Sequence, residues 1–360
     1  MRKIRAPFKA LCCLLVLLQA GGFAFAAKKA DKGKAKATKM PEWVNQPSSV
    51  YPNSTYITYV GSAADRNASE VSALQGLAAV FGQSVKSEST ASSRMVQAKA
   101  NGLVANANVQ SFSQDVKRVV DVDCLIGVET KEFWQDEKSG TWYAIAVLDK
   151  PKAVDIYSDM IKKNASAIST VLKNAEADKH SLDGFAAYDF AEDIAVENEG
   201  HLKKLSVIEP DSVAGLKSYC PSSKGFHAKK MEIAKQIPIC VETFNDEHGR
   251  FKEAFSQAIS ETGFRGTYDK SARYHLVAKF EFERSDTTDK KSVRCRYNCE
   301  SYILDTENSH QIVPFALKGR ESHVDYNEAK VKAEKALVTK IGKEFKTALN
   351  DYLKNLIVAE

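Results

Sequence analysis

The stretch from Val119 to Asp149, VVDVDCLIGVETKEFWQDEKSGTWYAIAVLD, constrains the fold more than any other part of the chain. Apolar and polar residues alternate from Val120 to Glu129, which is the pattern of a strand with one buried face. Residues 136–140 (DEKSG) are typical of a tight turn, and residues 142–148 are apolar on both faces of a strand. We therefore predict a β-hairpin whose second strand is covered on both sides, and a helix that begins near Pro151.

A strand and a helix before the hairpin are expected to pack against it. The sequence YITYVG predicts a strand that ends at Gly61. Asn67 and Glu70 have the spacing of a capping box, and apolar residues recur at helical spacing after them. This helix should cover one face of the hairpin, and the helix after the hairpin, or a partner protein, should cover the other. Residues 86–114 are mostly small and polar, and they predict a polar edge strand followed by a short helix or a mobile loop.

Residues 1–26 have the pattern of a secretory signal peptide. Basic residues precede an apolar run at residues 10–18 that is too short to span a bilayer, and a small-residue AFA motif follows it. We predict cleavage after Ala26 and export to the periplasm, with or without association with the outer membrane. Cys12 and Cys13 lie near the start of the apolar run, whereas a lipidated cysteine would lie at its end, so we expect no lipidation.

The next segment, residues 27–40 (AKKADKGKAKATKM), is a lysine-rich linker without aromatic residues. Such a composition predicts an extended, unfolded tether, which either keeps the protein soluble or contacts peptidoglycan or an anionic membrane surface. The whole chain has a formal charge of +5, of which the four basic residues of the signal and the six lysines less one aspartate of the linker contribute nine. The remainder is therefore mildly acidic, which argues against a nucleic-acid partner.

Five cysteines remain after removal of the signal: Cys124, Cys220, Cys240, Cys295 and Cys299. Cys295 and Cys299 are four residues apart in a predicted strand, so they share a face but lie too far apart for a disulfide with each other. No second cysteine pair or suitably spaced histidine accompanies them. We expect buried thiols rather than a metal site, and one disulfide among the five remains an alternative.

One family resemblance covers the N-terminal part of the chain. The residues that carry it are PEWV at 41–44, the strand ending at Gly61, the alanine-rich helix through Ala79, KSESTASS at 86–93 and WYAIAVLD at 142–149. This order resembles the LPP-twenty lipoprotein family, which includes small outer-membrane lipoproteins and the N-terminal parts of flagellar accessory proteins such as FlgP and FlgT. The resemblance implies an envelope-located structural or assembly component, with no enzymatic residues to carry over. The chain departs from the family in lacking a lipobox.

The sequence predicts an α+β protein of two α/β sandwich domains, each a mainly antiparallel sheet with helices on one face, joined through a long αα-hairpin. We assign residues 41–150 to the LPP-twenty-like domain and 151–208 to the helical hairpin. Residues 209–230, rich in Pro, Ser and Gly, are assigned to a linker. Residues 231–360 have the order β-α-β-β-β-α, which is similar to that of CsgG-like secretion proteins, the middle region of FlgT and the N-terminal domain of TolB.

The chain carries no recognisable catalytic motif. Its seven histidines have no metal-ligand spacing, and neither a glycine-rich phosphate loop nor a GxSxG elbow occurs. Residues 246–249 (DEHG) lie between a predicted strand and helix, where a site could form, but a solvated turn explains them as well. Asp121 and Asp123 share a strand face without a third group to complete an acid–base site. We expect no enzyme, no cofactor and no metal.

Two clusters are candidates for an interaction surface. Tyr157, Phe185 and Tyr188 lie on the helical hairpin, whose aromatic and alanine residues either bind a partner or cover a sheet. Arg294 and Arg296 share the polar face of one strand and could bind an anionic polymer or lipid head group. The acidic neighbours Glu281, Glu283 and Glu300 favour cross-strand pairing as the use of the two arginines.

These features favour an exported, non-enzymatic envelope protein that is a structural or assembly component of an envelope-spanning complex, of the flagellar basal-body or secretion type. Its expected partners are other envelope proteins. The alternative is a periplasmic module that carries a ligand or lipid between the helical hairpin and a sheet. An exposed apolar strip or an open sheet edge would favour assembly, whereas an apolar cavity would favour a carrier.

Overall fold

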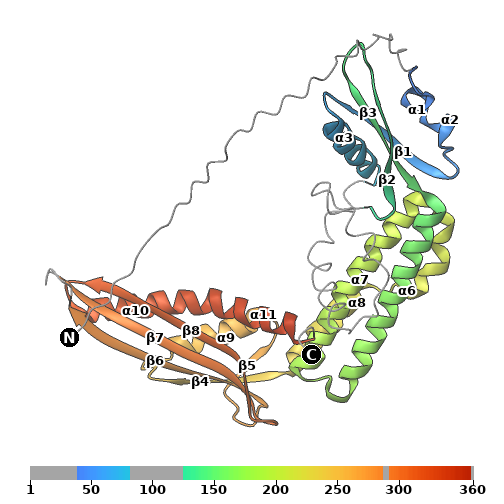
Figure 1. Ribbon diagram of the computed structural model, residues 1–360. Helices are drawn as coiled ribbons and strands as arrows, with labels where there is room; N and C mark the ends of the chain where they lie inside the picture. Colours follow the sequence, from blue (N-terminus) through green and yellow to red (C-terminus); the bar gives the residue numbers. More distant parts are fainter. Residues whose placement is uncertain (1–38, 82–124, 287–291, 358–360) are drawn as a thin grey trace, which may run out of the picture. The chain divides into compact units, whose positions relative to one another are not determined.

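The computed structural model describes residues 39–81, 125–286 and 292–357, and it is an α+β protein with two sheets (Figure 1). The fold class is as predicted. The predicted signal peptide, nearly all of the lysine-rich segment and the polar segment 86–114 lie outside the described residues, and so do Asp121, Asp123 and Cys124.

The N-terminal sheet has three antiparallel strands in the order β1-β3-β2: β1 (Tyr56–Ala63), β2 (Val128–Gln135) and β3 (Trp142–Asp149). The predicted turn joins β2 to β3, where the N–H of Gly140 donates to the carbonyl of Asp136. The first strand of the hairpin differs from the prediction, because β2 begins at Val128. Gly127, with φ of +90°, forms a turn directly before it, and a left-handed residue ends the regular alternation.

Helix α3 (Arg66–Ala79) covers the side of this sheet that carries Ala144, Ala146 and Leu148. Its N-cap is Asp65, whose carboxylate accepts from the N–H of Ala68 at 2.9 Å, so the predicted cap at Asn67 is wrong. The strand β1 continues past the predicted end at Gly61. A Cβ atom at Gly61 would lie 2.1 Å from a backbone nitrogen of α3, so this glycine permits close packing of helix on strand rather than ending the strand.

Two four-residue helices cover the other side of the sheet: α1 (Glu42–Asn45) and α2 (Pro47–Val50). Trp43 of α1 packs with Trp134, Ile145 and Val147 in a small core of its own. Neither the helix after the hairpin nor a partner protein is needed to cover this face, contrary to our expectation. Helices this short carry no periodic signal in a sequence.

The predicted αα-hairpin is formed by α6 (Lys150–Ala175) and α7 (Leu182–Ile208), joined by a short 3₁₀ turn, η2 (Glu176–Asp178). Asp149 and Ser181 cap the two helices, accepting from the backbone N–H groups of Lys152 and Gly184. The helices share a buried amide pair, in which Nδ2 of Asn164 donates to Oδ1 of Asn198 at 2.9 Å. Most of the α7 positions that carry apolar side chains are buried.

The segment predicted as a linker, residues 209–230, is largely helical. It contains two 3₁₀ turns, η3 (Pro210–Ser212) and η4 (Ala214–Tyr219), and the start of α8 (Ser223–Gln236). Lys230 of α8 forms ion pairs of 2.8 Å with Asp189 and 2.6 Å with Glu192 of α7. In this segment, Pro210 begins η3 and Ser223 begins α8. The segment therefore packs on α7 as helical turns and is not an open connection.

The C-terminal part follows the predicted order, with one additional short strand. Its elements are β4 (Pro238–Phe244), α9 (Arg250–Glu261), β5 (Arg265–Thr267), β6 (Tyr274–Asp286), β7 (Val293–Asp305), β8 (His310–His323), α10 (Tyr326–Lys340), the π-helical turn η5 (Ile341–Phe345) and α11 (Lys346–Leu356). The sheet order is β5-β4-β6-β7-β8; β4 runs parallel to β5 and β6, and the remaining pairs are antiparallel. Pro238 is the first residue of β4, where no ladder N–H is required.

Helices α9, α10 and α11 pack against one face of this five-stranded sheet (Figure 1). Alternate residues of β6, from Tyr274 to Phe280, are buried beneath them, and Phe255 and Phe345 lie edge to face with ring centroids 4.9 Å apart. Within the described residues, no helix covers the opposite face. We call that face of the sheet the helix-free face.

Candidate functional site

The strand register divides the helix-free face into rows of neighbouring side chains. From one end to the other, the rows on β6, β7 and β8 are Glu283, Arg296 and Arg320; Glu281, Asn298 and Lys318; Lys279, Glu300 and Ala316; and Val277 with Tyr302. Cys240, Glu242 and Phe244 of β4 continue the face beside His275, Val277 and Lys279. The face is therefore charged toward one end and apolar toward the other.

The apolar end forms a groove of about 660 Å³. Its lining includes Phe244, Val277, Tyr302, Pro314 and Ala316. Phe244 is 53% exposed, which is unusual for a large aromatic residue. Lys279, Glu300 and Gln311 also line the groove, so exposed apolar side chains lie there among charged and polar ones. Such a mixed surface is typical of an interaction site.

A bulge in the edge strand β8 shapes this groove. The register between β7 and β8 shifts between Ser301 and Ile303, and Val313 has a φ of +50°. Pro314 follows directly and has no N–H to offer to a further strand. A bulge and a proline both protect an edge strand from pairing with another chain, so the face of the sheet is better suited to binding than this edge.

The charged end carries four basic side chains on two neighbouring strands: Arg294, Arg296, Lys318 and Arg320. Arg296 lies directly opposite Arg320 on β8 and opposite Glu283 on β6. In the part of the chain that the structure describes, none of the four basic groups forms an ion pair. Glu281 is instead bound by Lys279 at 2.8 Å, and Glu300 accepts from the amide of Asn298 at 3.1 Å, so the expected cross-strand pairs with Arg294 and Arg296 do not form.

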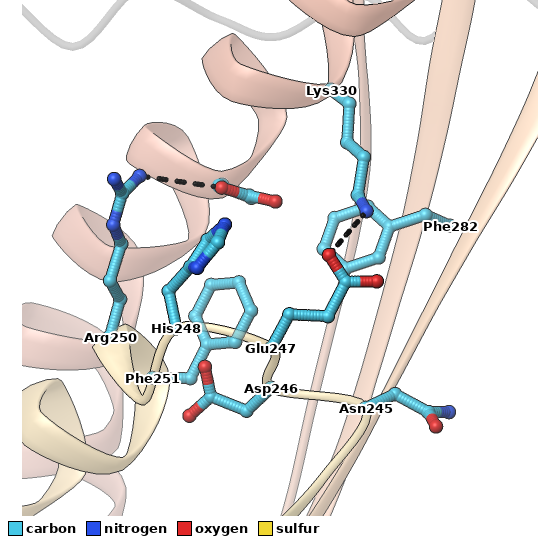
Figure 2. A pocket seen from close by; sticks show the side chains of 9 residues that line it. Asn245, Asp246, Glu247, His248, Arg250, Phe251, Phe282 and Lys330 are labelled. Carbon is cyan, nitrogen blue, oxygen red and sulfur yellow. Dashed lines mark hydrogen bonds and ion pairs between the residues drawn. The ribbon is translucent and has the colours of Figure 1, made fainter.

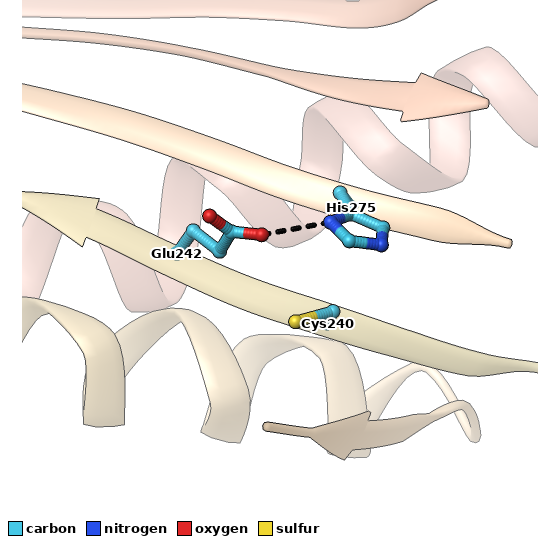
Figure 3. A group of neighbouring side chains, drawn as sticks. All are labelled: Cys240, Glu242 and His275. Atoms are coloured by element: carbon cyan, nitrogen blue, oxygen red, sulfur yellow. Dashed lines mark hydrogen bonds and ion pairs between the residues drawn. The ribbon is translucent and has the colours of Figure 1, made fainter. Parts of the chain in front are cut away.

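Three side chains with metal-binding atoms meet on the same face, beside the groove. Cys240 and Glu242 come from β4, and His275 comes from β6 directly opposite Cys240 (Figure 3). Their sulfur, carboxylate and ring nitrogen atoms lie within 4.8 Å of one another. Nδ1 of His275 is 2.8 Å from Oε1 of Glu242, and Nε2 is 2.9 Å from the carbonyl oxygen of Ala272. Burial raises the pKa of the Cys240 thiol, and the Glu242 charge adds to the effect.

The polar turn after β4 forms a small pocket, but its groups hold the turn together (Figure 2). Oδ2 of Asp246 accepts from the backbone N–H of Lys252 at 2.9 Å, which satisfies a donor in the first turn of α9. Glu247 pairs with Lys330 at 3.3 Å. The backbone of Asn245 is in the left-handed conformation, and its side-chain amide donates to the carbonyl of Phe280. These contacts agree with the interpretation of residues 246–249 as a turn.

The predicted interaction cluster on the helical hairpin is largely buried. Tyr157 is fully buried, and its hydroxyl accepts from the N–H of Ile126 at 3.1 Å. Phe185 is also buried, with its ring centroid 4.8 Å from that of Phe264. These two residues belong to cores, so the prediction that they form a surface is corrected; Tyr188 is half-buried beside Phe226.

The four described cysteines, Cys220, Cys240, Cys295 and Cys299, are free thiols, and all but Cys220 are buried. This agrees with the expectation of buried thiols, and no disulfide joins any two of these four. Among the described residues, no helix is both long enough and apolar enough to cross a membrane.

Comparisons with known proteins identify structural neighbours only. No family model matches the chain, and no curated protein does. A secreted protein of Helicobacter pylori is 12% identical over 81% of this chain and 97% of its own, with a TM-score of 0.41. A minor lipoprotein of Acinetobacter baumannii (16% identity, 33% of this chain, 92% of its own) has a TM-score of 0.25, and a candidate lipoprotein of Caulobacter crescentus (13%, 34% and 92%) has 0.23. Likenesses of this size carry no argument about function.

Proposed function

We propose that this chain is an exported, non-enzymatic component of the cell envelope that binds a partner protein through the helix-free face. Its role would be to assemble or brace an envelope-spanning complex of the flagellar basal-body or secretion type. The observation that supports this proposal is the groove of about 660 Å³ at the apolar end, with Phe244 exposed at its edge. Apolar side chains at the centre of a surface, with charged groups around them, are the usual anatomy of a protein interface.

The charge pattern indicates the chemistry of the partner. Lys318 lies one row beyond the groove residue Ala316, and Arg296, Arg320 and Arg294 follow farther along the same face. None of the four forms an ion pair among the described residues, and guanidinium groups bind carboxylates with two parallel hydrogen bonds. A partner segment would therefore place apolar side chains in the groove and acidic side chains over β7 and β8.

Export rests on the N-terminal pattern of the sequence. If the signal is cleaved after Ala26, the mature chain begins with the lysine-rich linker, residues 27–40, which would contact peptidoglycan or an anionic membrane surface. N-terminal sequencing of the protein recovered from the periplasm should start at Ala27. Another start site, or retention of the chain in the cytoplasm, would contradict the assignment.

The second candidate function is a carrier of a ligand or lipid. The groove volume lies within the roughly 300–1,000 Å³ of small-molecule sites, which favours this alternative. Such sites enclose most of the ligand surface, however, whereas the exposed ring of Phe244 marks an open groove. We therefore place the carrier second.

In-cell photo-crosslinking from position 316 tests the docking proposal. Ala316 lies in the groove and is exposed, so a photoreactive side chain there replaces only a methyl group. The first variant combines Arg296→Glu and Arg320→Glu. Its matched control combines Lys332→Glu and Lys335→Glu, which make the same charge change at exposed positions of α10.

We expect one envelope protein to be captured. Its crosslinked peptide should carry acidic residues next to apolar ones. Capture should fall at least tenfold in the arginine variant and remain unchanged in the lysine variant, because only the former alters the helix-free face. Equal capture in both variants would overturn the proposed surface. Recovery of a small lipid without any protein would replace the docking function with the carrier.

A further inference from the structure

We propose that Cys240, Glu242 and His275 form a binding site for a single transition-metal ion of the Zn²⁺ class. The inference is independent of the docking function, since it rests on different side chains. It starts from the parallel pairing of β4 with β6, which places Cys240 opposite His275, while Glu242 shares the strand face of Cys240. The three donors are thus held by the two strands of one sheet.

The hydrogen bonds of His275 are those expected of a metal ligand. The carbonyl of Ala272 lies 2.9 Å from Nε2 and accepts its proton, and this leaves Nδ1 facing the Glu242 carboxylate at 2.8 Å. A neutral ring with its proton on Nε2 would place two acceptors against each other at that distance. A proton or a metal ion is therefore required between these two atoms. A ligating histidine typically donates its other N–H to a backbone carbonyl, as His275 does.

The donor set selects the class of metal. A thiolate, an imidazole and a carboxylate are all ligands of Zn²⁺, whereas Mg²⁺ and Ca²⁺ prefer oxygen donors alone. Tetrahedral ligands at 2.0–2.3 Å from Zn²⁺ lie about 3.3–3.8 Å from one another. The three donor atoms lie within 4.8 Å of one another, so side-chain shifts of about an ångström would bring them to these separations. Three protein ligands leave one position for water or an exogenous ligand.

Cobalt(II) and zinc(II) titrations of the exported chain, freed of metal with a chelator, test the site. We expect one equivalent of Co²⁺ to bind with a thiolate charge-transfer band, and Zn²⁺ to abolish that band by displacement. Cys240→Ser should remove the band. His275→Gln and Glu242→Gln should weaken Zn²⁺ binding by on the order of tenfold to 100-fold or more.

The controls are Cys220→Ser and His310→Gln, which remove the same residue types outside the site and should bind as the unaltered chain does. Circular dichroism establishes that each variant is folded. A measurement without substitutions completes the test: Zn²⁺ should slow alkylation of Cys240 at least tenfold, read by mass spectrometry, and leave the rate at Cys220 unchanged.

Three outcomes would overturn the site. They are the absence of a cobalt–thiolate band at millimolar Co²⁺, a band that survives in both Cys240→Ser and His275→Gln, and alkylation of Cys240 that is insensitive to Zn²⁺. In each of these cases the contact between His275 and Glu242 is a structural hydrogen bond. Failure of the metal site leaves the crosslinking experiment on the groove unaffected.

Discussion

Trp43 donates its indole N–H to Oε2 of Glu132 at 2.9 Å, across 89 residues of sequence. The hydroxyl of Tyr51 donates to the other carboxylate oxygen at 2.8 Å. Trp43 itself is only 2% exposed. One carboxylate on β2 therefore holds the two short helices that cover one face of the N-terminal sheet.

The first prediction concerns this attachment. Trp43→Ala should lower the free energy of unfolding by about 3–5 kcal/mol, because it removes a large buried side chain and leaves a cavity. Trp43→Phe should cost about 1–2 kcal/mol, since most of the packing remains but the hydrogen bond to Glu132 is lost. Urea unfolding followed by circular dichroism measures both. Val50→Ala on α2, at a 44% exposed position, is the control and should change stability by less than about 0.5 kcal/mol.

The second prediction is the alkaline titration of Tyr51. Burial, and next the hydrogen bond to Glu132, raise its pKa to about 12 from an ordinary value of 10. The stabilisation from the neutral phenol is complete below pH 10 and is lost as the pH rises through 12, because the unfolded chain ionises first. Phenolate absorbance should show Tyr51 as a late-titrating group that disappears in Tyr51→Phe. Ionisation of Tyr51 near pH 10 in the folded protein would contradict the contact.

The third prediction concerns Arg273 and Asp305, which form a two-bond ion pair with Nε–Oδ1 and Nη2–Oδ2 distances of 3.0 and 2.9 Å. Burial alone would raise the pKa of Asp305, but the Arg273 hydrogen bonds and the backbone N–H of Glu307 outweigh it and lower the pKa. Arg273→Ala should lower the free energy of unfolding by about 2–3 kcal/mol, because the buried carboxylate of Asp305 loses its cationic partner. The loss is not larger because Arg273 is partly exposed and water screens its charge. Lys163→Ala, which breaks the exposed ion pair with Asp159, is the control in urea unfolding. If Arg273→Ala lowered the free energy of unfolding no more than this control, the prediction would be refuted.

The same pair predicts an acid dependence. A carboxyl whose pKa is lower in the folded state stabilises the protein above about pH 4, and this contribution disappears as the pH falls through the folded pKa. The difference in unfolding free energy between the unaltered chain and Asp305→Asn should therefore be largest near neutral pH and should narrow below about pH 4. A difference that is constant with pH would show that Asp305 is not ionised in the native pair.

The fourth prediction compares two phenylalanines of the C-terminal sheet. Phe280 is fully buried and its ring stacks on Phe251 with centroids 4.1 Å apart, so Phe280→Ala should cost about 3–5 kcal/mol. Phe244 on the helix-free face is half exposed, and Phe244→Ala should cost less than about 1 kcal/mol while it abolishes capture from position 316. Equal costs in urea unfolding would mean that Phe244 belongs to a core.

Local patterns in the sequence account for most of the secondary structure. The period-two alternation of residues 274–282, the long helical stripe from Ala329 to Leu356 and the turn at residues 136–140 all predict the elements that form there. In the described part of the strand predicted at residues 120–129, β2 begins only at Val128, because Gly127 adopts a left-handed conformation that composition does not reveal. The segment predicted as a linker, residues 209–230, is largely helical, because Pro and Ser begin helical turns as readily as they occupy loops.

The candidate sites were harder to find in the sequence. Arg294 and Arg296 were identified from their alternation, but their partners depend on the pairing of β6, β7 and β8. Alternation also places Cys240, Glu242 and Phe244 on one strand face, which was a usable signal. His275 lies on another strand and shows no ligand spacing to Cys240, so no motif could join them.

Hydrophobic periodicity and turn residues are local properties, and they are enough to give this chain its α+β class, its helical hairpin and the order of its C-terminal strands. Which strands become neighbours, and which face of a sheet remains uncovered, depends on contacts between segments far apart in the chain. Trp43 meets Glu132, and His275 meets Cys240, because packing and hydrogen-bond register bring those segments together. Both the helix-free face and the metal-binding arrangement arise at that level, since a side chain becomes part of a site only when its neighbours are in place.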